Sequence, residues 1–170
     1  EAEGVPDEPG CAVGVARDGD TVFTGGYGVA DLATGEPIDA GTTFDIASVS
    51  KQFTATAILL LADEGALDLD DPVRDYVPEL PAADGAVTLE QLLHHTGGLP
   101  DYTELLAEDY DDTDVTTTEQ ALDAVVDAGG PTFEPGSTFE YSNTGYFLLG
   151  LVVAGVAGAP LGAVLEDEVF

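Results

Sequence analysis

The residues in this sequence most suited to chemistry are Ser48 and Lys51, which lie three positions apart in the stretch Ala47-Ser48-Val49-Ser50-Lys51-Gln52-Phe53-Thr54. Lys51 is the only lysine in a chain that has 3 Lys+Arg against 34 Asp+Glu. Residues three apart on a helix are neighbours, so the serine hydroxyl and the lysine amine can meet there. A serine beside an amine is a nucleophile beside a candidate base, which is what acyl transfer requires.

The same spacing has a second interpretation, because Ser-x-x-Lys also arises by chance as a helix cap followed by a surface lysine. A strongly acidic surface gains nothing from its only lysine, which weakens that interpretation here. Ser48 is expected where a short extended segment meets the start of a helix. A nucleophile in that place has its own backbone N–H available for an oxyanion, and the helix dipole favours the developing negative charge.

A second group of candidate residues is Tyr141-Ser142-Asn143, which follows the turn Pro135-Gly136. Residues two apart in an extended segment share one face, so the Tyr141 phenol and the Asn143 amide can both point into one cleft. The alternative is that Asn143 caps the following helix while Tyr141 packs beside Phe139. The residues alone leave both interpretations open.

Together these motifs resemble the serine β-lactamase and penicillin-binding protein family, most closely its class C β-lactamase, DD-peptidase and esterase-like branch. Further matching stretches are His95-Thr96-Gly97-Gly98-Leu99-Pro100, Pro9-Gly10-Cys11-Ala12-Val13-Gly14-Val15 and Gly26-Tyr27-Gly28-Val29-Ala30-Asp31. The resemblance implies that Ser48 is the acylated nucleophile and Lys51 its activator. It also implies that Tyr141 is a general acid/base and that Asn143 binds the amide or carbonyl of the substrate.

The function implied by the resemblance is that of a serine hydrolase that forms an acyl-enzyme with a small-molecule amide, β-lactam or ester, without metal or cofactor. The family's third motif, a Lys- or His-x-Gly on a late strand, has no counterpart late in this chain. We therefore expect an amino-terminal portion of the fold. The alternative is an inactive truncated remnant, or an acyl-ligand-binding or interaction domain of the same fold.

The predicted fold class is α+β, β-lactamase/DD-peptidase-like, with one incomplete domain over residues 1–170. An amino-terminal hairpin of an antiparallel sheet precedes a mostly helical region, and the later strands of the sheet are missing. The expected strands are Cys11–Arg17 and Thr21–Val29, and the expected helices include 53–64, 88–93, 118–128, 143–157 and 161–169. Gly25-Gly26 indicates a bulge or a close approach. An isolated hairpin is marginally stable, so its free edge could support self-association.

The net charge of −31 excludes the usual electrostatic route to nucleic acid and disfavours anionic membranes. With 44% hydrophobic residues the chain is expected to fold inside an acidic shell, as in salt-adapted proteins. The composition favours the cytoplasm of a halophile over export. The uncharged stretch from Ser142 to Leu165 is interrupted at Gly158-Ala159-Pro160, which favours a buried core helix over a membrane span.

Two further groups of residues invite a site but have simpler interpretations. His94 and His95 lack the adjoining motif of a Ser-His triad and are expected to anchor their loop. Asp101 and the cluster Asp109 to Asp114 could suggest a cation site, but in so acidic a chain they are expected to be solvated surface residues.

Overall fold

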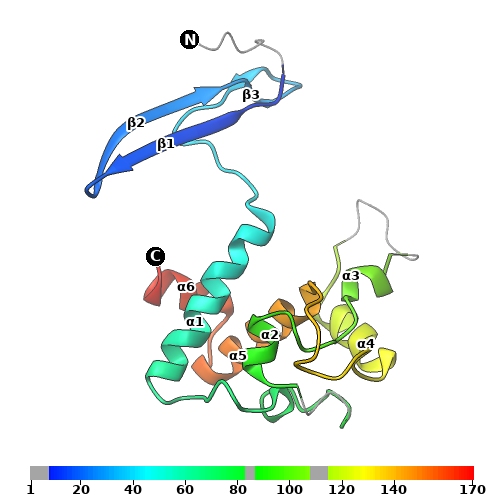
Figure 1. Ribbon diagram of the computed structural model, residues 1–170. Helices are drawn as coiled ribbons and strands as arrows, with labels where there is room; N and C mark the ends of the chain where they lie inside the picture. The colour runs from blue at the N-terminus through cyan, green and yellow to red at the C-terminus, as the bar shows by residue number, and fades with distance from the viewer. Residues whose placement is uncertain (1–7, 83–86, 108–114) are drawn as a thin grey trace. The chain divides into compact units, whose positions relative to one another are not determined.

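The computed structural model describes residues 8–82, 87–107 and 115–170, and the chain divides into two compact units, Glu1–Ala47 and Ser48–Phe170. The first unit is built from strands and the second from helices (Figure 1). This arrangement has the hairpin and the helical region that the predicted α+β class requires. That residues 1–170 form a single incomplete domain stays a prediction.

The first unit begins with the predicted hairpin, formed by antiparallel strands β1 (Cys11–Arg17) and β2 (Asp20–Tyr27). The two residues of its turn, Asp18 and Gly19, have φ angles of 52° and 87°. Two successive positive φ angles give a turn whose twist matches that of the strands. The predicted hairpin is therefore confirmed.

The second strand is shorter than predicted, because Gly28 with φ of 76° breaks the expected run to Val29. Val29 instead opens β3 (Val29–Asp31), which pairs with β4 (Glu36–Pro37) in a separate two-stranded sheet. Strands of two and three residues are too short to give a period-2 pattern, so the sequence did not predict them.

Gly26 marks a close approach of two backbone segments. A Cβ at this position would lie 1.8 Å from the carbonyl oxygen of Ile38. The irregularity in the β1–β2 register lies elsewhere, between Val15 and Ala16. Of the two interpretations of Gly25-Gly26, the close approach is the one that the structure has.

The β1–β2 hairpin carries large apolar side chains that are not covered. All seven residues of β1 are exposed. The exposed apolar side chains of the hairpin, 37% to 54% accessible, are Val13, Val15, Val22, Phe23 and Tyr27. A sheet normally buries one apolar face, so this hairpin matches the expectation of an unfinished sheet. Self-association through its edge stays a prediction.

The second unit consists of two 3₁₀ turns and six helices within the described residues (Figure 1). The turns are η1 (Ala47–Ser50), which begins at the last residue of the first unit, and η2 (Val73–Asp75). The helices are α1 (Lys51–Asp63), α2 (Leu89–Leu93), α3 (Tyr102–Leu105), α4 (Thr118–Ala128), α5 (Asn143–Ala157) and α6 (Leu161–Glu168).

Helix α5 is the centre of the helical unit and packs against α1, α2, α3 and α6. Its fully buried apolar side chains are Leu148, Leu149, Val152 and Val153. Burying one such side chain contributes about 1.5–3 kcal/mol relative to leaving it exposed. The prediction of a core helix in this uncharged stretch is therefore confirmed. No single helix among the described residues has the length and apolarity to cross a membrane. Helices α5 and α6 together have that length and apolarity, but they are bent by 72° relative to each other.

The helix boundaries follow from capping chemistry. Thr88 and Gln91 form a capping box at the start of α2, in which each side chain bonds the backbone N–H of the other residue. Thr117 and Gln120 form a second box at the start of α4. Gly158 ends α5 with φ of 66°, a left-handed conformation that glycine adopts without strain. These local signals fix where the helices that flank the candidate site begin and end.

Candidate active site

Ser48 and Lys51 lie at the junction between η1 and α1. Lys51 is the first residue of α1, and its Nζ donates a hydrogen bond to Ser48 Oγ at 3.2 Å. Ala47, directly before the serine, has φ of 45°, a left-handed conformation that costs a residue with a Cβ about 1–2 kcal/mol. Its backbone N–H donates to Asp45 Oδ1 at 2.8 Å, which helps to hold this conformation. The contact predicted from the Ser-x-x-Lys spacing is present.

Tyr141 reaches Ser48 from the segment that precedes α5. Its hydroxyl lies 2.6 Å from Ser48 Oγ, and either oxygen can donate the proton. Lys51 Nζ lies 5.0 Å from the centre of the tyrosine ring. Hydrogen bonding to Lys51 and then to Ser48 lowers the pKa of the Tyr141 phenol. The structure thus brings the three predicted catalytic side chains together, with the Ser48 hydroxyl between a phenol and an amine.

Asn143 joins this cluster through Lys51. It is the first residue of α5, after an N-cap at Ser142, so the alternative that Asn143 caps this helix is wrong. Its Oδ1 accepts a hydrogen bond from Lys51 Nζ at 2.8 Å, and its Nδ2 donates to Asp101 Oδ2 at 3.0 Å. The amide is thus hydrogen-bonded on both sides. Its expected role as a ligand of the substrate stays a prediction.

Asp101 corrects one expectation from the sequence. It is half-buried rather than a solvated surface residue, and its Oδ2 accepts from both the backbone N and the Nδ2 of Asn143, at 2.6 and 3.0 Å. Burial alone would raise the pKa of Asp101, but the hydrogen bonds from Asn143 and Thr103 together lower it. The carboxylate also lies at the start of α5, where a negative charge is favoured by the helix dipole. The cluster Asp109 to Asp114 lies outside the described residues.

His95 supports the Tyr141 ring. The imidazole stacks on Tyr141 with ring centres 4.5 Å apart, and the ring of Tyr146 lies 5.1 Å away from the imidazole. His95 Nδ1 accepts from the backbone N–H of Ser142 at 3.2 Å, and the His95 carbonyl accepts from Glu140 N at 2.9 Å. The prediction that His95 anchors its loop is confirmed. Tyr141 therefore packs on His95, whose ring centre also lies 5.9 Å from that of Phe139.

The environment of His95 favours its neutral form. Burial comes first and the positive charge of Lys51 second as causes that lower the pKa of this imidazole. Because Nδ1 accepts a hydrogen bond, the proton of the neutral ring lies on Nε2. His94, by contrast, is exposed and follows the last residue of α2. The histidines thus differ in role, and only His95 contacts the cluster.

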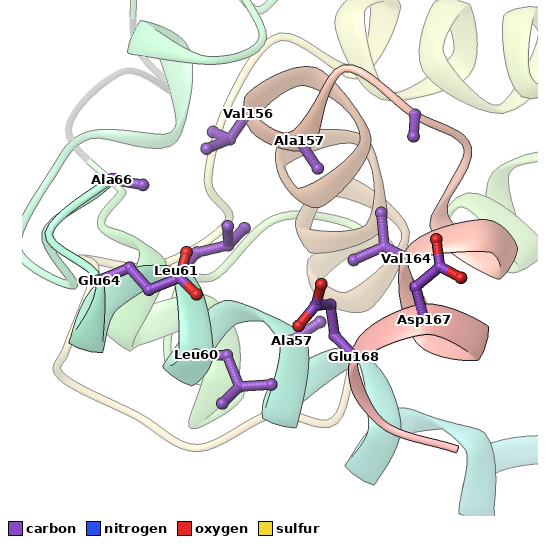
Figure 2. A pocket seen from close by; sticks show the side chains of 11 residues that line it. Ala57, Leu60, Leu61, Glu64, Ala66, Val156, Ala157, Val164, Asp167 and Glu168 are labelled. Atoms are coloured by element: carbon purple, nitrogen blue, oxygen red, sulfur yellow. The ribbon is translucent and has the colours of Figure 1, made fainter.

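Two cavities of the helical unit differ in their relation to this cluster. One of about 290 Å³ is partly lined by Asp101, Tyr141 and Ser142, so it lies beside the candidate residues. A second of about 350 Å³ lies between α1, α5 and α6 and has no candidate residue in its lining (Figure 2). Leu60, Leu61 and Val156 are apolar parts of that lining, which also carries three carboxylates. We assign no function to the second cavity.

The described part of the chain offers no group of three or more His, Cys, Asp or Glu side chains that could hold a metal ion. That the site works without metal or cofactor stays a prediction. The arrangement places the Ser48 hydroxyl in direct contact with a phenol and an amine. This is the set of groups that a serine acyl transfer uses.

The sequence did not predict the contribution of Asp101 or Tyr146. The Tyr146 hydroxyl donates to the Leu93 carbonyl at 3.1 Å, and its ring centre lies 5.7 Å from Lys51 Nζ. Asp101 does carry a local signal, because Asp before Thr103 is a typical helix start, and it does cap α3. Nothing local connects it to Asn143, which is 42 residues away in the chain.

Sequence and structure comparisons both find β-lactamase and penicillin-binding protein relatives. The sequence model of a family described as Beta-lactamase matches residues 2–170. Penicillin-binding protein 4* of Bacillus subtilis (strain 168) is 32% identical over 156 residues, which are 91% of this chain and 34% of that protein. Two solved structures are also similar. The octameric penicillin-binding protein homologue from Pyrococcus abyssi has a TM-score of 0.83 at 32% identity, covering 95% of this chain and 38% of that one.

The second solved structure is the D-amino acid amidase from Ochrobactrum anthropi SV3, with a TM-score of 0.78 at 34% identity. The match covers 95% of this chain and 44% of that one. These likenesses confirm the predicted β-lactamase/DD-peptidase fold. The chain spans about a third of the length of the curated relative it matches.

Proposed function

The chain belongs to the Beta-lactamase family, and on that premise we propose that it acts as a serine hydrolase that cleaves an amide, β-lactam or ester through an acyl-enzyme. The observation that carries the proposal is the position of Ser48 Oγ, which lies 2.6 Å from the Tyr141 hydroxyl and 3.2 Å from Lys51 Nζ. A serine hydroxyl is a weak nucleophile until a neighbouring base takes its proton. Two such neighbours contact this hydroxyl.

In the acylation step, Ser48 Oγ attacks the carbonyl carbon of the substrate. The hydroxyl proton passes to the coupled Lys51–Tyr141 pair, and the tetrahedral oxyanion forms near the Ser48 backbone N–H. When the bond to the leaving group breaks, that group takes the proton from the pair. The products are an ester on Ser48 and a free amine or alcohol, or the opened ring in the case of a lactam.

In the deacylation step, water attacks the Ser48 ester, and the same pair accepts a proton from the water. Ser48 Oγ then takes the proton back as the acid leaves. The lowered pKa of Tyr141 supports a role for the phenol as the group that exchanges these protons. Because Lys51 and Tyr141 are neighbours, their protonation is coupled and belongs to the pair.

The substrate class is proposed from the cavity and from the relatives. The cavity of about 290 Å³ beside Tyr141 has room for a small acyl group and is partly lined by Leu99 and Pro100. One similar protein is named as a D-amino acid amidase, one as a penicillin-binding protein, and one as a penicillin-binding protein homologue. A small amide, lactam or ester is consistent with both observations.

The second candidate function is an acyl-ligand-binding module that does not turn over, or an inactive remnant. The exposure of the site favours it, because Ser48 is exposed and Tyr141 is 46% accessible to solvent. An open site positions a substrate poorly, which slows the reaction. The two candidates differ in whether Ser48 forms a covalent bond.

The test is covalent labelling in multimolar KCl, because the acidic composition predicts a salt-dependent fold. The chain is incubated with a fluorophosphonate or a penicillin, and the intact mass is measured. The hydrolase proposal predicts one adduct, which is lost in Ser48→Ala and kept in Ser50→Ala, a matched control in the same turn. Absence of an adduct from protein whose circular dichroism shows a folded chain would favour the binding module instead.

A further inference from the structure

The two carboxylate oxygens of Asp101 accept hydrogen bonds from two different elements. Oδ1 accepts from the backbone N and the Oγ1 of Thr103, at 2.9 and 2.6 Å, which caps α3. Oδ2 accepts from the backbone N and the Nδ2 of Asn143, at 2.6 and 3.0 Å, at the start of α5. A carboxylate that only held a helix start would need no bond to the Asn143 side chain.

The bond to the side chain decides which way the Asn143 amide faces. An asparagine has an acceptor oxygen and a donor nitrogen in nearly equivalent positions, so it can be rotated by half a turn without changing shape. In the reversed orientation Oδ1 would face Asp101 Oδ2, which is an acceptor, and Nδ2 would face Lys51 Nζ, which is a donor. Both contacts would then be repulsive. An ionised Asp101 therefore excludes the reversed orientation.

The orientation of Asn143 in turn fixes Lys51. Asn143 Oδ1 has no hydrogen to give, so it always takes one N–H of the lysine, at 2.8 Å. Fixing one N–H sets the rotation of the amine about the Cε–Nζ bond. It therefore also sets the direction of the hydrogen bond from Lys51 Nζ to Ser48 Oγ, at 3.2 Å. The amine held in this way points a second N–H at Ser48 Oγ, which accepts it.

We propose that Asp101 is a positioning residue: its carboxylate locks the Asn143 amide so that Oδ1 holds the Lys51 amine toward Ser48. The importance of this contact for catalysis rests on the proposed function. The contact itself can be tested without any substrate. Asp101 does not touch the reacting atoms and acts through two other side chains.

The composition of the chain provides the assay. Because Lys51 is the only lysine, incorporation of ¹⁵N-lysine gives one side-chain Nζ signal. The exchange rate of its protons with water reports how firmly the amine is held. Three variants separate geometry from charge. Asp101→Asn and Asp101→Glu change the hydrogen bonds between residue 101 and the Asn143 amide. Glu104→Gln removes a charge from α3 and leaves those hydrogen bonds in place.

Asp101→Asn keeps a good N-cap residue for α3, and Asp101→Glu keeps the negative charge. We expect the Lys51 protons to exchange about tenfold faster in both variants, as for the loss of one hydrogen bond to a charged group. Glu104→Gln should stay within about twofold of the wild-type protein, as expected for an exposed charge. If only one Asp101 variant folds by circular dichroism, that variant decides the result.

Two outcomes would overturn the proposal: Asp101 variants that exchange at the wild-type rate, or Glu104→Gln that exchanges as fast as they do. The second outcome would assign the effect to charge alone. Labelling by a fluorophosphonate then tests the functional consequence, with slower labelling expected in the Asp101 variants only. If the wild-type protein is not labelled, the hydrolase proposal fails while the exchange rates still decide the role of Asp101.

Discussion

Replacing Tyr141 by phenylalanine removes one oxygen and leaves the ring that stacks on His95 at 4.5 Å. That oxygen lies 2.6 Å from Ser48 Oγ. Because Tyr141 is 46% accessible, the substitution should change the free energy of unfolding of the chain by only about 0.5 kcal/mol. A general acid/base contributes about 10²–10⁴ in rate. We therefore expect Tyr141→Phe to fold normally and to react with a fluorophosphonate about a hundredfold more slowly or worse.

Tyr146→Phe is the matched control, because Tyr146 also contacts the His95 ring but its hydroxyl bonds elsewhere. That hydroxyl is half-buried and donates to the Leu93 carbonyl at 3.1 Å. Burial first, and the charge of Tyr141 second, raise the pKa of Tyr146 and keep it a donor. Loss of this bond should cost about 1 kcal/mol of unfolding free energy. The labelling rate should be unchanged.

The assay measures both quantities on the same preparations, at a KCl concentration that keeps the chain folded. Denaturant titration followed by circular dichroism gives the unfolding free energies, and intact mass against time gives the labelling rates. The two variants should separate, with Tyr141→Phe affecting the rate and Tyr146→Phe affecting stability. Equal labelling rates for Tyr141→Phe and the wild-type protein would refute the proposed proton transfer through this phenol.

Three further predictions concern the core, the pH dependence and the salt dependence. Leu148→Ala should cost about 2–5 kcal/mol of unfolding free energy, since this side chain is fully buried in α5, and the exposed Leu32→Ala should cost less than about 0.5 kcal/mol, both measured by denaturant titration. Burial and the Lys51 charge lower the pKa of His95 below its ordinary value of 6.5, so the neutral ring contributes stability above that pH that is lost as the pH falls through the folded pKa. The unfolding midpoint of the wild-type protein should therefore drop more between pH 7 and pH 5 than that of His95→Gln, and equal drops would contradict this reasoning. With a net charge of −31, lowering KCl from multimolar to ordinary buffer should unfold the chain, and an unchanged circular dichroism spectrum would show that the acidic shell does not require salt.

The parts of the site that are close in the chain could be predicted, because local geometry determines them. Ser48 and Lys51 are three residues apart at a helix start, and their contact follows from helical spacing. The contact between Ser48 and Tyr141 spans 93 residues, and only the resemblance to a family suggested it. The hydrogen bonds from Asn143 to Asp101 were not predicted, because one aspartate among many in an acidic chain carries no signal of its tertiary contact.

The fold shows the same division between local and distant information. The hairpin and the helices other than α3 were predicted because turn residues and capping residues lie within the elements they define. The four residues of α3 are too few to give a helical periodicity. The pair β3 and β4 was missed because three and two residues give no periodicity. The end of β2 was not predicted, because it depends on the positive φ of Gly28, and the apolar pattern continues past this residue.

The central claim is that Ser48 forms a covalent acyl-enzyme, and the most direct measurement is to locate the bond. The folded chain is reacted with a penicillin, digested, and mapped by mass spectrometry, and the adducted peptide is treated with hydroxylamine. We predict one adduct on the peptide that contains Ser48, released by hydroxylamine because it is an ester. An adduct on Lys51 or Tyr141, or a folded chain with no adduct at all, would contradict the account.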